Sequence, residues 1–482
     1  MTIVMNSVIM HISVSVLVLA KNSLTEVSQC HLLFSGWHFF CFPALFWHKA
    51  GSPFGVPVFV IYANHDPGRN ACISIWRISR HRAGFLHGYQ GGKSVKKMKG
   101  ACIMQNCQDN YSTTFSSYSA MYDYHDEQTK KSQWITCRVD ELQIEPLDAA
   151  SPLYGNLSAF ALGTSLDAVE DTASNLGLAM RVNGNLYPLR MTANKSLLDR
   201  AKIGGTALPK LSRSVLAEVL NACLKLYSSS ALLLIRDEKV SAVHSGDSTD
   251  YSILPINELL GTLKAKLDAR FPGNEYECGY CDHSLVSASW KMPDQKEDLL
   301  GAYTKLLASQ GKTAMADKLM PGIRFITSDT GVASAKVSAL LVGGQHPIHI
   351  GGCIAVDHRH QKKVSDFDAA LDQLFAQFGD SIAKLQKLLE VHLDYPVNAM
   401  TRICKKLSLP KKAAVEAIAM FEMAYGGGTA TAHDVFLAMQ EIPFILKTEN
   451  TPESKLLVVE ENMARALTFK WGDFDLAKAV SY

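Results

Sequence analysis

Apolar residues recur at helical or alternating spacing from about residue 155 onward, so the pattern predicts regular structure over the rest of the chain. In 212–227 the apolar positions share one helix face, behind a serine, Ser212 or Ser214, that caps the first turn. Residues 230–245 hold two apolar runs around a charged turn, which is typical of a β-hairpin. Further helices are predicted over 254–273 and 293–310, and further strands over 274–292, 322–329, 333–344 and 347–358.

A long amphipathic helix is predicted to start near Ser365, with apolar residues at steps of three and four from Phe367 to Leu389. This stripe fits either a coiled-coil seam or, as we favour, a single helix packed across a sheet. Residues 396–482 contain the patterns of three or four shorter helices. Hairpin-linked strands followed by helices predict an α+β fold, namely an antiparallel, hairpin-rich sheet with packed helices and a C-terminal helical subdomain.

The N-terminal part of the chain differs in composition from the rest. Residues 1–103 carry ten Lys and Arg against only Glu26 and Asp66, and their large apolar groups follow neither helical nor strand spacing. Subtracting them from the 48 basic and 46 acidic residues of the whole chain leaves 38 and 44, a mildly acidic remainder that is typical of a soluble domain. Residues 99–101 can be encoded by a purine-rich ribosome-binding sequence at a suitable distance before Met104. We therefore predict that 1–103 is a non-native upstream extension or a disordered segment.

Residues 5–20 offer a rival interpretation as a signal peptide, but no basic segment precedes the apolar run and no clear cleavage site follows it. The run is also short and interrupted by polar residues, so no membrane partner is predicted. Beyond the N-terminal part we expect a polar leader arm over 104–154, an α+β core domain over 155–363 and a helical region over 364–482. The seven Cys of these segments are odd in number and scattered, which favours reduced thiols in the cytoplasm over a disulfide framework.

Two short motifs are weak matches to known catalytic loops. The stretch GYQGGKS at 88–94 is similar to a phosphate-binding loop, but His87 stands where the first glycine is required. The Asp329-Thr330-Gly331 sequence matches the loop of aspartic proteases, but the chain holds no second copy for the paired carboxylate. We interpret it as a turn between two strands, where Asp bonds its own backbone and Gly accepts positive φ.

The best metal candidates are Cys278, Cys281 and His283, because two thiolates and an imidazole can fill three corners of a zinc tetrahedron. In a strand, however, positions three apart point to opposite faces, so two half-buried strand cysteines are the favoured interpretation. Asp357 beside His358 could support acid–base chemistry, but no recognisable nucleophile accompanies them. No catalytic residue, metal or cofactor is therefore predicted.

The most informative feature is a basic strip in an otherwise acidic body. Between residues 190 and 213 only Asp199 is acidic, and a second basic cluster follows the strand at 347–358. Such a concentration of cations attracts phosphates to one place, and Tyr187, Tyr280 and Trp290 could stack on unpaired bases. The predicted nucleic-acid contacts are Arg190, Lys195, Arg200, Lys202, Lys210, Arg213, Arg359, Lys362 and Lys363. The alternative is a solvated helix face without a ligand.

The C-terminal two-thirds contains further recognisable sequences. These are IRFITSDTGVASAKVSALL, the DHRH that precedes the long helix, and YGGGTATAHDVFLAMQEI at 425–442, where Thr429 or Thr431 would cap a helix that carries Ala438 and Glu441. Together they resemble the phage- and plasmid-associated family of unknown function that is numbered nine hundred and thirty-two. The resemblance covers about 155–445, implies a cytoplasmic protein of a mobile element working near nucleic acid, and carries over no catalytic residues.

These observations lead to three hypotheses. The first is a non-catalytic nucleic-acid-binding protein of phage or plasmid origin, forming a homo-oligomer that binds or anneals single-stranded DNA. The second is a metal-dependent enzyme that uses Cys278, Cys281 and His283. The third is a phage structural or host-interaction protein, in which the long helix mediates assembly and the basic strip is incidental.

Overall fold

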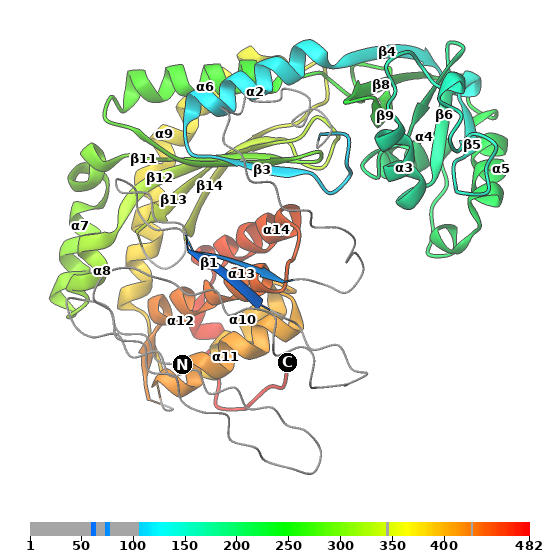
Figure 1. The fold of residues 1–482 in the computed structure, drawn as a ribbon. Helices are drawn as coiled ribbons and strands as arrows, with labels where there is room; N and C mark the ends of the chain where they lie inside the picture. Colours follow the sequence, from blue (N-terminus) through cyan, green and yellow to red (C-terminus); the bar gives the residue numbers. More distant parts are fainter. Residues whose placement is uncertain (1–58, 64–72, 78–105, 344–346, 426–427) are drawn as a thin grey trace. The chain divides into compact units, whose positions relative to one another are not determined.

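The computed structural model describes residues 59–63, 73–77, 106–343, 347–425 and 428–482 (Figure 1). The chain divides into two compact units, 1–95 and 96–482. In the first unit, β1 (Phe59–Ala63) pairs antiparallel with β2 (Ile73–Arg77). The predicted boundary after residue 103 and the rival signal peptide lie outside the described residues, so both stay predictions.

The second unit is built on an antiparallel sheet of six strands, which we call the main sheet. Its order is β14-β13-β12-β11-β10-β3. Its strands are β3 (Ser112–Phe115), β10 (Glu275–Asp282), β11 (Val286–Lys291), β12 (Met320–Thr327), β13 (Ala335–Val342) and β14 (Ile348–Val356). Alternation along these strands gives the sheet two different faces. On β11 and β12, for example, Trp290 and Phe325 are fully buried on the apolar face, whereas Ser289 and Arg324 lie opposite each other on the polar face.

Helices cover the apolar face of the main sheet. They are α2 (Tyr118–Lys131), α6 (Ile256–Arg270), α7 (Lys296–Ser309), α8 (Thr313–Lys318) and α9 (Val364–Lys387). The apolar stripe of α9 packs on β13 and β14, and the ring of Phe367 meets that of Phe325 edge-on at 5.8 Å between centroids. This contact buries the stripe inside the chain, so its place is across the sheet and not in a coiled-coil seam. The α+β fold class is confirmed.

Residues 104–154 do not form the predicted polar leader arm. Their described part supplies β3, the helix α2, and two strands of the subdomain described next. Tyr118 shows why composition misled the prediction: its ring packs near Trp290 while its hydroxyl donates to the carbonyl oxygen of Leu260 at 3.3 Å. Tyrosine counts as polar in the sequence, but here its ring packs in the apolar core while its hydroxyl finds a hydrogen-bond partner.

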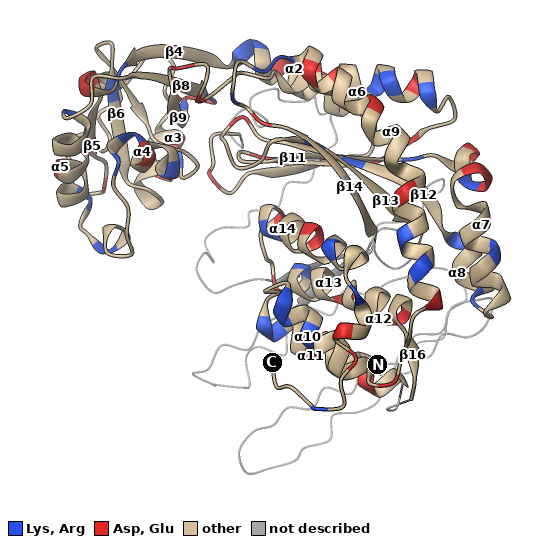
Figure 2. Ribbon diagram, turned by 180° about the vertical axis from the view of Figure 1, so that it is seen from behind, with Lys and Arg blue, Asp and Glu red and all other residues tan. Residues whose placement is uncertain are grey.

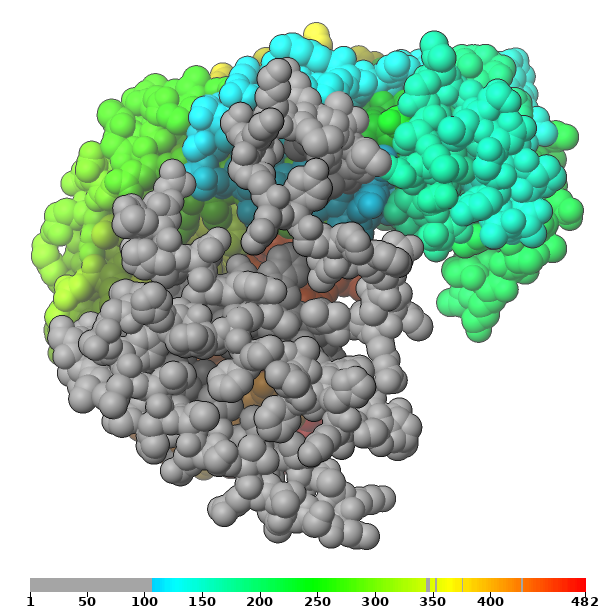
Figure 3. Space-filling model, in the orientation of Figure 1, coloured from blue at the N-terminus to red at the C-terminus, as the bar shows by residue number. Residues whose placement is uncertain are grey.

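Residues 133–247 form a small subdomain with its own apolar core. It holds two three-stranded sheets, β4-β8-β9 and β5-β6-β7, with three helices; its packed surface is cyan to green in Figure 3. The elements are β4 (Gln133–Arg138), β5 (Gln143–Pro146), α3 (Leu166–Ser174), β6 (Leu178–Val182), β7 (Asn185–Pro188), α4 (Ala193–Ala201), α5 (Arg213–Leu224), β8 (Ser230–Arg236) and β9 (Lys239–Ser245). The predicted 230–245 hairpin is β8–β9, and Ser212 caps α5 as expected.

The segment predicted as one strand, 274–292, is the hairpin β10–β11. Its turn follows Asp282, whose carboxylate accepts hydrogen bonds from the backbone N–H groups of Ser284 and Leu285 at 2.7 and 2.8 Å. Such a side-chain acceptor reverses the chain without glycine or proline. The alternating pattern continues through this turn, which is why the break was not predicted.

The C-terminal helical region packs against the polar face of the main sheet. Its helices are α10 (Pro396–Lys406), α11 (Lys411–Tyr425), α12 (Ala432–Met439), α13 (Glu441–Thr448) and α14 (Glu453–Ala464). Thr431 caps α12, one of the two positions expected. The contact includes ion pairs, because the Arg324 guanidinium donates to the Glu460 carboxylate of α14 at 2.5 Å and His349 Nε2 lies 3.3 Å from the same oxygen. It also includes an apolar cluster, in which Leu457 of α14 packs with Ile326 and Leu285. None of the described helices is both long and apolar enough to pass through a bilayer.

Candidate nucleic-acid interface

A groove of about 460 Å³ separates the small subdomain from loops at one end of the main sheet. Its small-subdomain wall comes from α4 and the end of β9, and its other wall from the β12–β13 loop and the residues after β14. Its polar lining residues include Thr192, Lys195, Ser196, Asp199, Arg200, Lys202, His244, Ser245, Asp250, Tyr251, Thr330, Ser334, Asp357, His358 and Arg359.

The groove brings together cations from both predicted basic clusters. Lys195, Arg200 and Lys202 come from α4 and its C-terminal end, while Arg359 follows β14. Ala193, Leu197 and Ala201 bury the other face of α4, which turns the lysines outward. Within the part of the chain that the structure describes, none of these four cations is in an ion pair. The Nε of Arg200 is buried and has no hydrogen-bond partner among those residues.

Two carboxylates of the groove are held by serine hydroxyls. Ser245 Oγ donates to Oδ2 of Asp250 at 3.0 Å, and Ser334 Oγ donates to Oδ1 of Asp357. Asp199, on the exposed side of α4, has no such serine partner among the described residues. None of the three carboxylates forms an ion pair with a described cation. The groove therefore contains four cations and three carboxylates that form no ion pairs with one another.

The floor of the groove is a stack of buried rings. His244 and Tyr251 stack face to face with centroids 3.6 Å apart, and His358 lies nearly parallel to Tyr251 at 5.7 Å. The Tyr251 hydroxyl and His244 Nε2 both donate to the carbonyl oxygen of Asp329 at 2.8 Å. Burial lowers the pKa of His244 to about 4, with a smaller contribution from the nearby Arg200 charge. These rings stack on one another, so they form a rigid neutral floor and leave no free face for a base.

Backbone hydrogen bonds join the two loops that carry Asp250 and Arg359. The N–H groups of His360 and Gln361 donate to the carbonyl oxygens of Thr249 and Ser248 at 2.8 and 3.0 Å. Across the floor, the Arg236 guanidinium of β8 pairs with the Asp329 carboxylate of the β12–β13 loop. The Asp-Thr-Gly sequence is therefore a turn, with Gly331 at a φ of +79°, but Ser328 Oγ, and not the Asp329 carboxylate, accepts hydrogen bonds from the backbone N–H groups of Thr330 and Val332. It fixes the groove wall instead of presenting a catalytic carboxylate.

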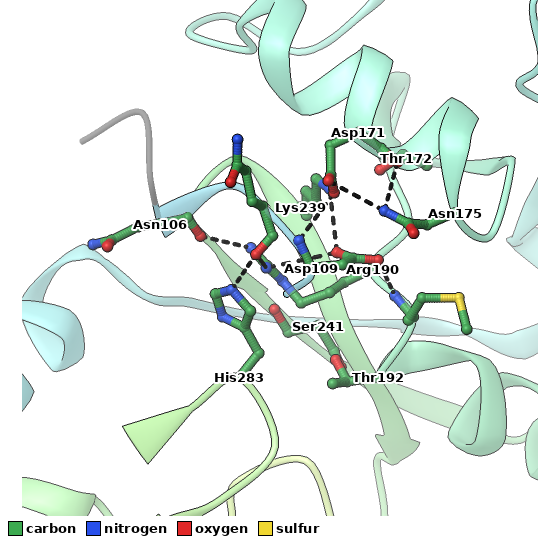
Figure 4. Close-up of polar contacts among 12 residues, drawn as sticks. Asn106, Asp109, Asp171, Thr172, Asn175, Arg190, Thr192, Lys239, Ser241 and His283 are labelled. Carbon is green, nitrogen blue, oxygen red and sulfur yellow. Dashed lines mark hydrogen bonds and ion pairs between the residues drawn. The ribbon is translucent and has the colours of Figure 1, made fainter. Parts of the chain in front are cut away.

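Arg190 is not a surface cation, which corrects one predicted nucleic-acid contact (Figure 4). Its side chain is fully buried, and its guanidinium donates to the carbonyl oxygens of Asn106 and Gln108 at 3.3 Å each. Asp109 lies 3.7 Å from it and also accepts from the Lys239 ammonium at 3.2 Å. We call Asp109, Asp171, Arg190 and Lys239 the buried charge cluster. The sequence does not predict that Arg190 is buried, because it lies in the same basic run as the cations that line the groove.

The remaining predicted cations lie outside the groove. The Arg213 guanidinium donates to the carbonyl oxygen of Asn175 at 3.3 Å, and Lys362 pairs with Asp366 at 3.1 Å. Lys210 and Lys363 are exposed. Elsewhere, basic residues also neighbour acidic ones, as on α6 and α9 (Figure 2), where Lys266 lies 3.1 Å from Asp372. Other described cations, such as Lys225 and Lys384, are also in no ion pair, so what sets the groove apart is that four such cations line one recess.

The weak metal candidates are not brought together. Cys278 is exposed on the polar face of β10, whereas Cys281 is 2% exposed on the opposite face, where burial raises its pKa to about 12. His283 Nε2 donates to the carbonyl oxygen of Gln108 at 2.8 Å, and burial lowers the pKa of this imidazole to about 2. The described residues contain no group of three or more His, Cys, Asp or Glu arranged for a metal ion. This geometry gives the metal-enzyme hypothesis no support.

The aromatic residues proposed for base stacking do not line the groove. Trp290 is fully buried between Tyr118 and Tyr276, and the Tyr280 hydroxyl donates to Asp282 at 2.8 Å. What sequence reasoning missed is the pair of serine-held carboxylates, Asp250 and Asp357. The sequence signals only Asp357, through the neighbouring His358, and Asp250 has no local signal at all.

Comparison of the chain with family models, with curated proteins and with solved structures gave no match. The resemblance to the phage- and plasmid-associated family therefore stays a prediction.

Proposed function

We propose that this protein binds single-stranded nucleic acid without catalysis, and that the groove is the contact surface. The observation that carries the proposal is the convergence of Lys195, Arg200, Lys202 and Arg359 on one groove with no ion-pair partners among the described residues. Unpaired cations in a recess attract phosphates more strongly than cations already neutralised by carboxylates.

A single strand suits this groove better than a duplex. Double-stranded DNA is stiff over about 150 base pairs, so it cannot bend its phosphates into a recess between two lobes. A single strand is flexible, so it can thread its backbone through the groove and bring successive phosphates to the four cations. The proposal includes annealing, because phosphates held on the cations would leave bases free to pair.

Salt dependence of binding tests the proposal. Each phosphate contact on a single strand contributes about −0.7 to the slope of log K against log salt, so four contacts give a slope of about −2.8. In Lys195→Ala/Lys202→Ala two contacts are lost, and the slope should fall to about −1.4 with weaker binding. Fluorescence anisotropy with labelled fifteen-nucleotide homopolymers, titrated over a range of salt concentrations, gives both quantities.

The matched control is Lys406→Ala/Lys411→Ala, which removes two exposed lysines that line no part of the groove. Affinity and slope should equal those of the unaltered protein. If the control weakens binding as much as the groove variant, the contact surface lies elsewhere. If no oligonucleotide binds even at low salt, the proposed function is wrong.

The cellular setting is part of the same proposal. We place the protein in the cytoplasm of a cell that carries a mobile element, working as a homo-oligomer. Six described cysteines, namely Cys137, Cys223, Cys278, Cys281, Cys353 and Cys404, form no disulfide, which suits a reducing compartment. Light scattering with and without oligonucleotide would measure the oligomeric state; a monomer under both conditions would refute that part.

A further inference from the structure

The groove holds more negative charge than a simple phosphate channel needs. Asp199, Asp250 and Asp357 line the same recess as the four cations, and none of them pairs with a described cation. Both kinds of charge are therefore open to a ligand that carries anionic groups as well as hydrogen-bond donors.

Asp250 and Asp357 are oriented for accepting such donors. One carboxylate oxygen of Asp250 accepts a hydrogen bond from the Ser245 hydroxyl, and one of Asp357 accepts from the Ser334 hydroxyl. The other oxygen, Oδ1 of Asp250 and Oδ2 of Asp357, accepts no hydrogen bond from the described residues, and both side chains are exposed to the groove. An ionised carboxylate can only accept, so the group that completes it must donate.

The hydroxyls of the groove cannot serve the ligand as donors in place of the cations. Thr192, Ser196 and Thr330 give their protons to backbone carbonyl oxygens, and both aspartate-bound serines give theirs to carboxylates. The donors that remain are guanidinium and ammonium groups, which suit phosphate. The acceptors that remain are carboxylates, and two of them, Asp250 and Asp357, are oriented by a serine hydroxyl.

We infer that the groove binds RNA in preference to DNA, with phosphates on the cations and ribose 2′-hydroxyls on Asp250 and Asp357. This inference rests on the proposed function and refines the expected ligand from single-stranded DNA to a ribose-containing strand. Among the donors of a nucleotide, the ribose hydroxyl stands at a fixed distance from the phosphate whatever the base. A carboxylate that accepts from a ribose hydroxyl is a recurrent way of recognising this sugar, and the 2′-hydroxyl separates RNA from DNA at a given site.

The test compares three strands of identical base sequence, oligo(U), oligo(dU) and 2′-fluoro oligo(U), by anisotropy with the full chain. Uracil has no exocyclic amino group, so the 2′ substituent is the only donor that differs. A hydrogen bond to a charged group changes affinity by about tenfold. Oligo(U) should therefore bind at least about tenfold more tightly than both other strands, including the fluoro strand, which retains the ribose-like sugar shape without a donor.

The variants separate recognition from simple repulsion. Asp250→Asn/Asp357→Asn should weaken oligo(U) by about tenfold or more while leaving oligo(dU) unchanged or tighter. Asp199→Asn removes the same kind of charge from the groove without a serine-held acceptor, so it should tighten both strands alike. Circular dichroism and thermal melting check that each variant is folded.

The outcomes distinguish the two proposals. Equal affinity for oligo(U) and oligo(dU), with the double variant tightening both, would overturn ribose recognition and leave nucleic-acid binding intact. A preference for oligo(U) that the double variant does not reduce would also overturn the assignment to Asp250 and Asp357. Absence of binding to all three strands would refute the proposed function itself.

Discussion

The buried charge cluster allows a stability prediction that the structure makes quantitative. Asp109 has a side chain that is only 5% exposed. It accepts hydrogen bonds from the Lys239 ammonium and, at 2.9 Å, from the backbone N–H of Met191, and it forms an ion pair with the Arg190 guanidinium at 3.7 Å. Arg190 and Lys239 have no exposed side-chain surface. In Asp109→Asn both cations keep their charge, but only Lys239 keeps an ion-pair partner, which is Asp171.

Removing one partner of a buried ion pair costs about 3–5 kcal/mol, because a buried charge is left without compensation. The lower limit applies here, since Asp171 still pairs with Lys239, so we expect a loss of about 3 kcal/mol in the free energy of unfolding. Urea unfolding followed by circular dichroism measures it. With slopes of about 1–3 kcal/mol per molar urea, the midpoint should fall by about 1–3 M.

Two further variants decide whether charge is the cause. Asp140→Asn removes the carboxylate of the exposed Arg138 pair and should leave the midpoint unchanged within error. Asp109→Asn/Lys239→Met removes an anion and a cation together, so it should be less destabilised than the sum of the single variants. The reasoning is refuted if Asp109→Asn shifts the midpoint no more than Asp140→Asn does, or if the double variant is additive.

Three other predictions follow from the fold. Burial would raise the pKa of Glu460, but the Arg324 charge and the His349 contact outweigh it and lower the pKa to about 2. The ion pair therefore stabilises the fold above about pH 4.5, and this stabilisation is lost as the pH falls toward 2. In acid titrations followed by tryptophan fluorescence, the stability of the unaltered protein should therefore approach that of Glu460→Gln as the pH falls. Gly343→Ala should lower the free energy of unfolding by more than about 1 kcal/mol in urea titration, because its φ is +107° and a Cβ would lie 1.8 Å from the Lys318 carbonyl oxygen. Phe367→Ala should cost about 3–5 kcal/mol by the same assay, because its ring is fully buried against β12; a loss below 1 kcal/mol would contradict the packing of α9.

The sequence predicted those elements whose apolar residues keep one period. The hairpin over 230–245, the capped helix after Ser212 and the long helix with Phe367 follow directly from spacing. Residues 104–154 were misread because tyrosine rings and a buried histidine, His125, supply core contacts that hydropathy counts as polar. The single strand expected over 274–292 hid a turn because a carboxylate, and not glycine or proline, reverses the chain.

The candidate groove was only partly predictable. A count of basic residues identifies the run that contains Lys195, Arg200 and Lys202, but no local pattern shows that Arg359, about 160 positions later, faces them. Nor does sequence show that Ser245 and Ser334 each orient a carboxylate in the same recess, because serine and aspartate are common in loops. Convergence of distant loops is a property of the fold and not of any segment.

The basic run from 190 to 213 divides into residues with opposite roles. Arg190 lies at the start of the run, where it is fully buried and pairs with Asp109 in the buried charge cluster. Just before α4 begins, the Thr192 hydroxyl donates to the Ser241 carbonyl oxygen at 2.7 Å. Lys195 and Lys202 come from the same helix but face the groove. Because the cluster fixes the base of α4, loosening it should move the groove cations as well as lower stability. Asp109→Asn should therefore weaken oligonucleotide binding although it touches no ligand, whereas Lys195→Ala/Lys202→Ala should weaken binding and leave the urea midpoint unchanged. An Asp109→Asn protein that binds oligonucleotides normally while it is folded would show that the two halves of the run are independent.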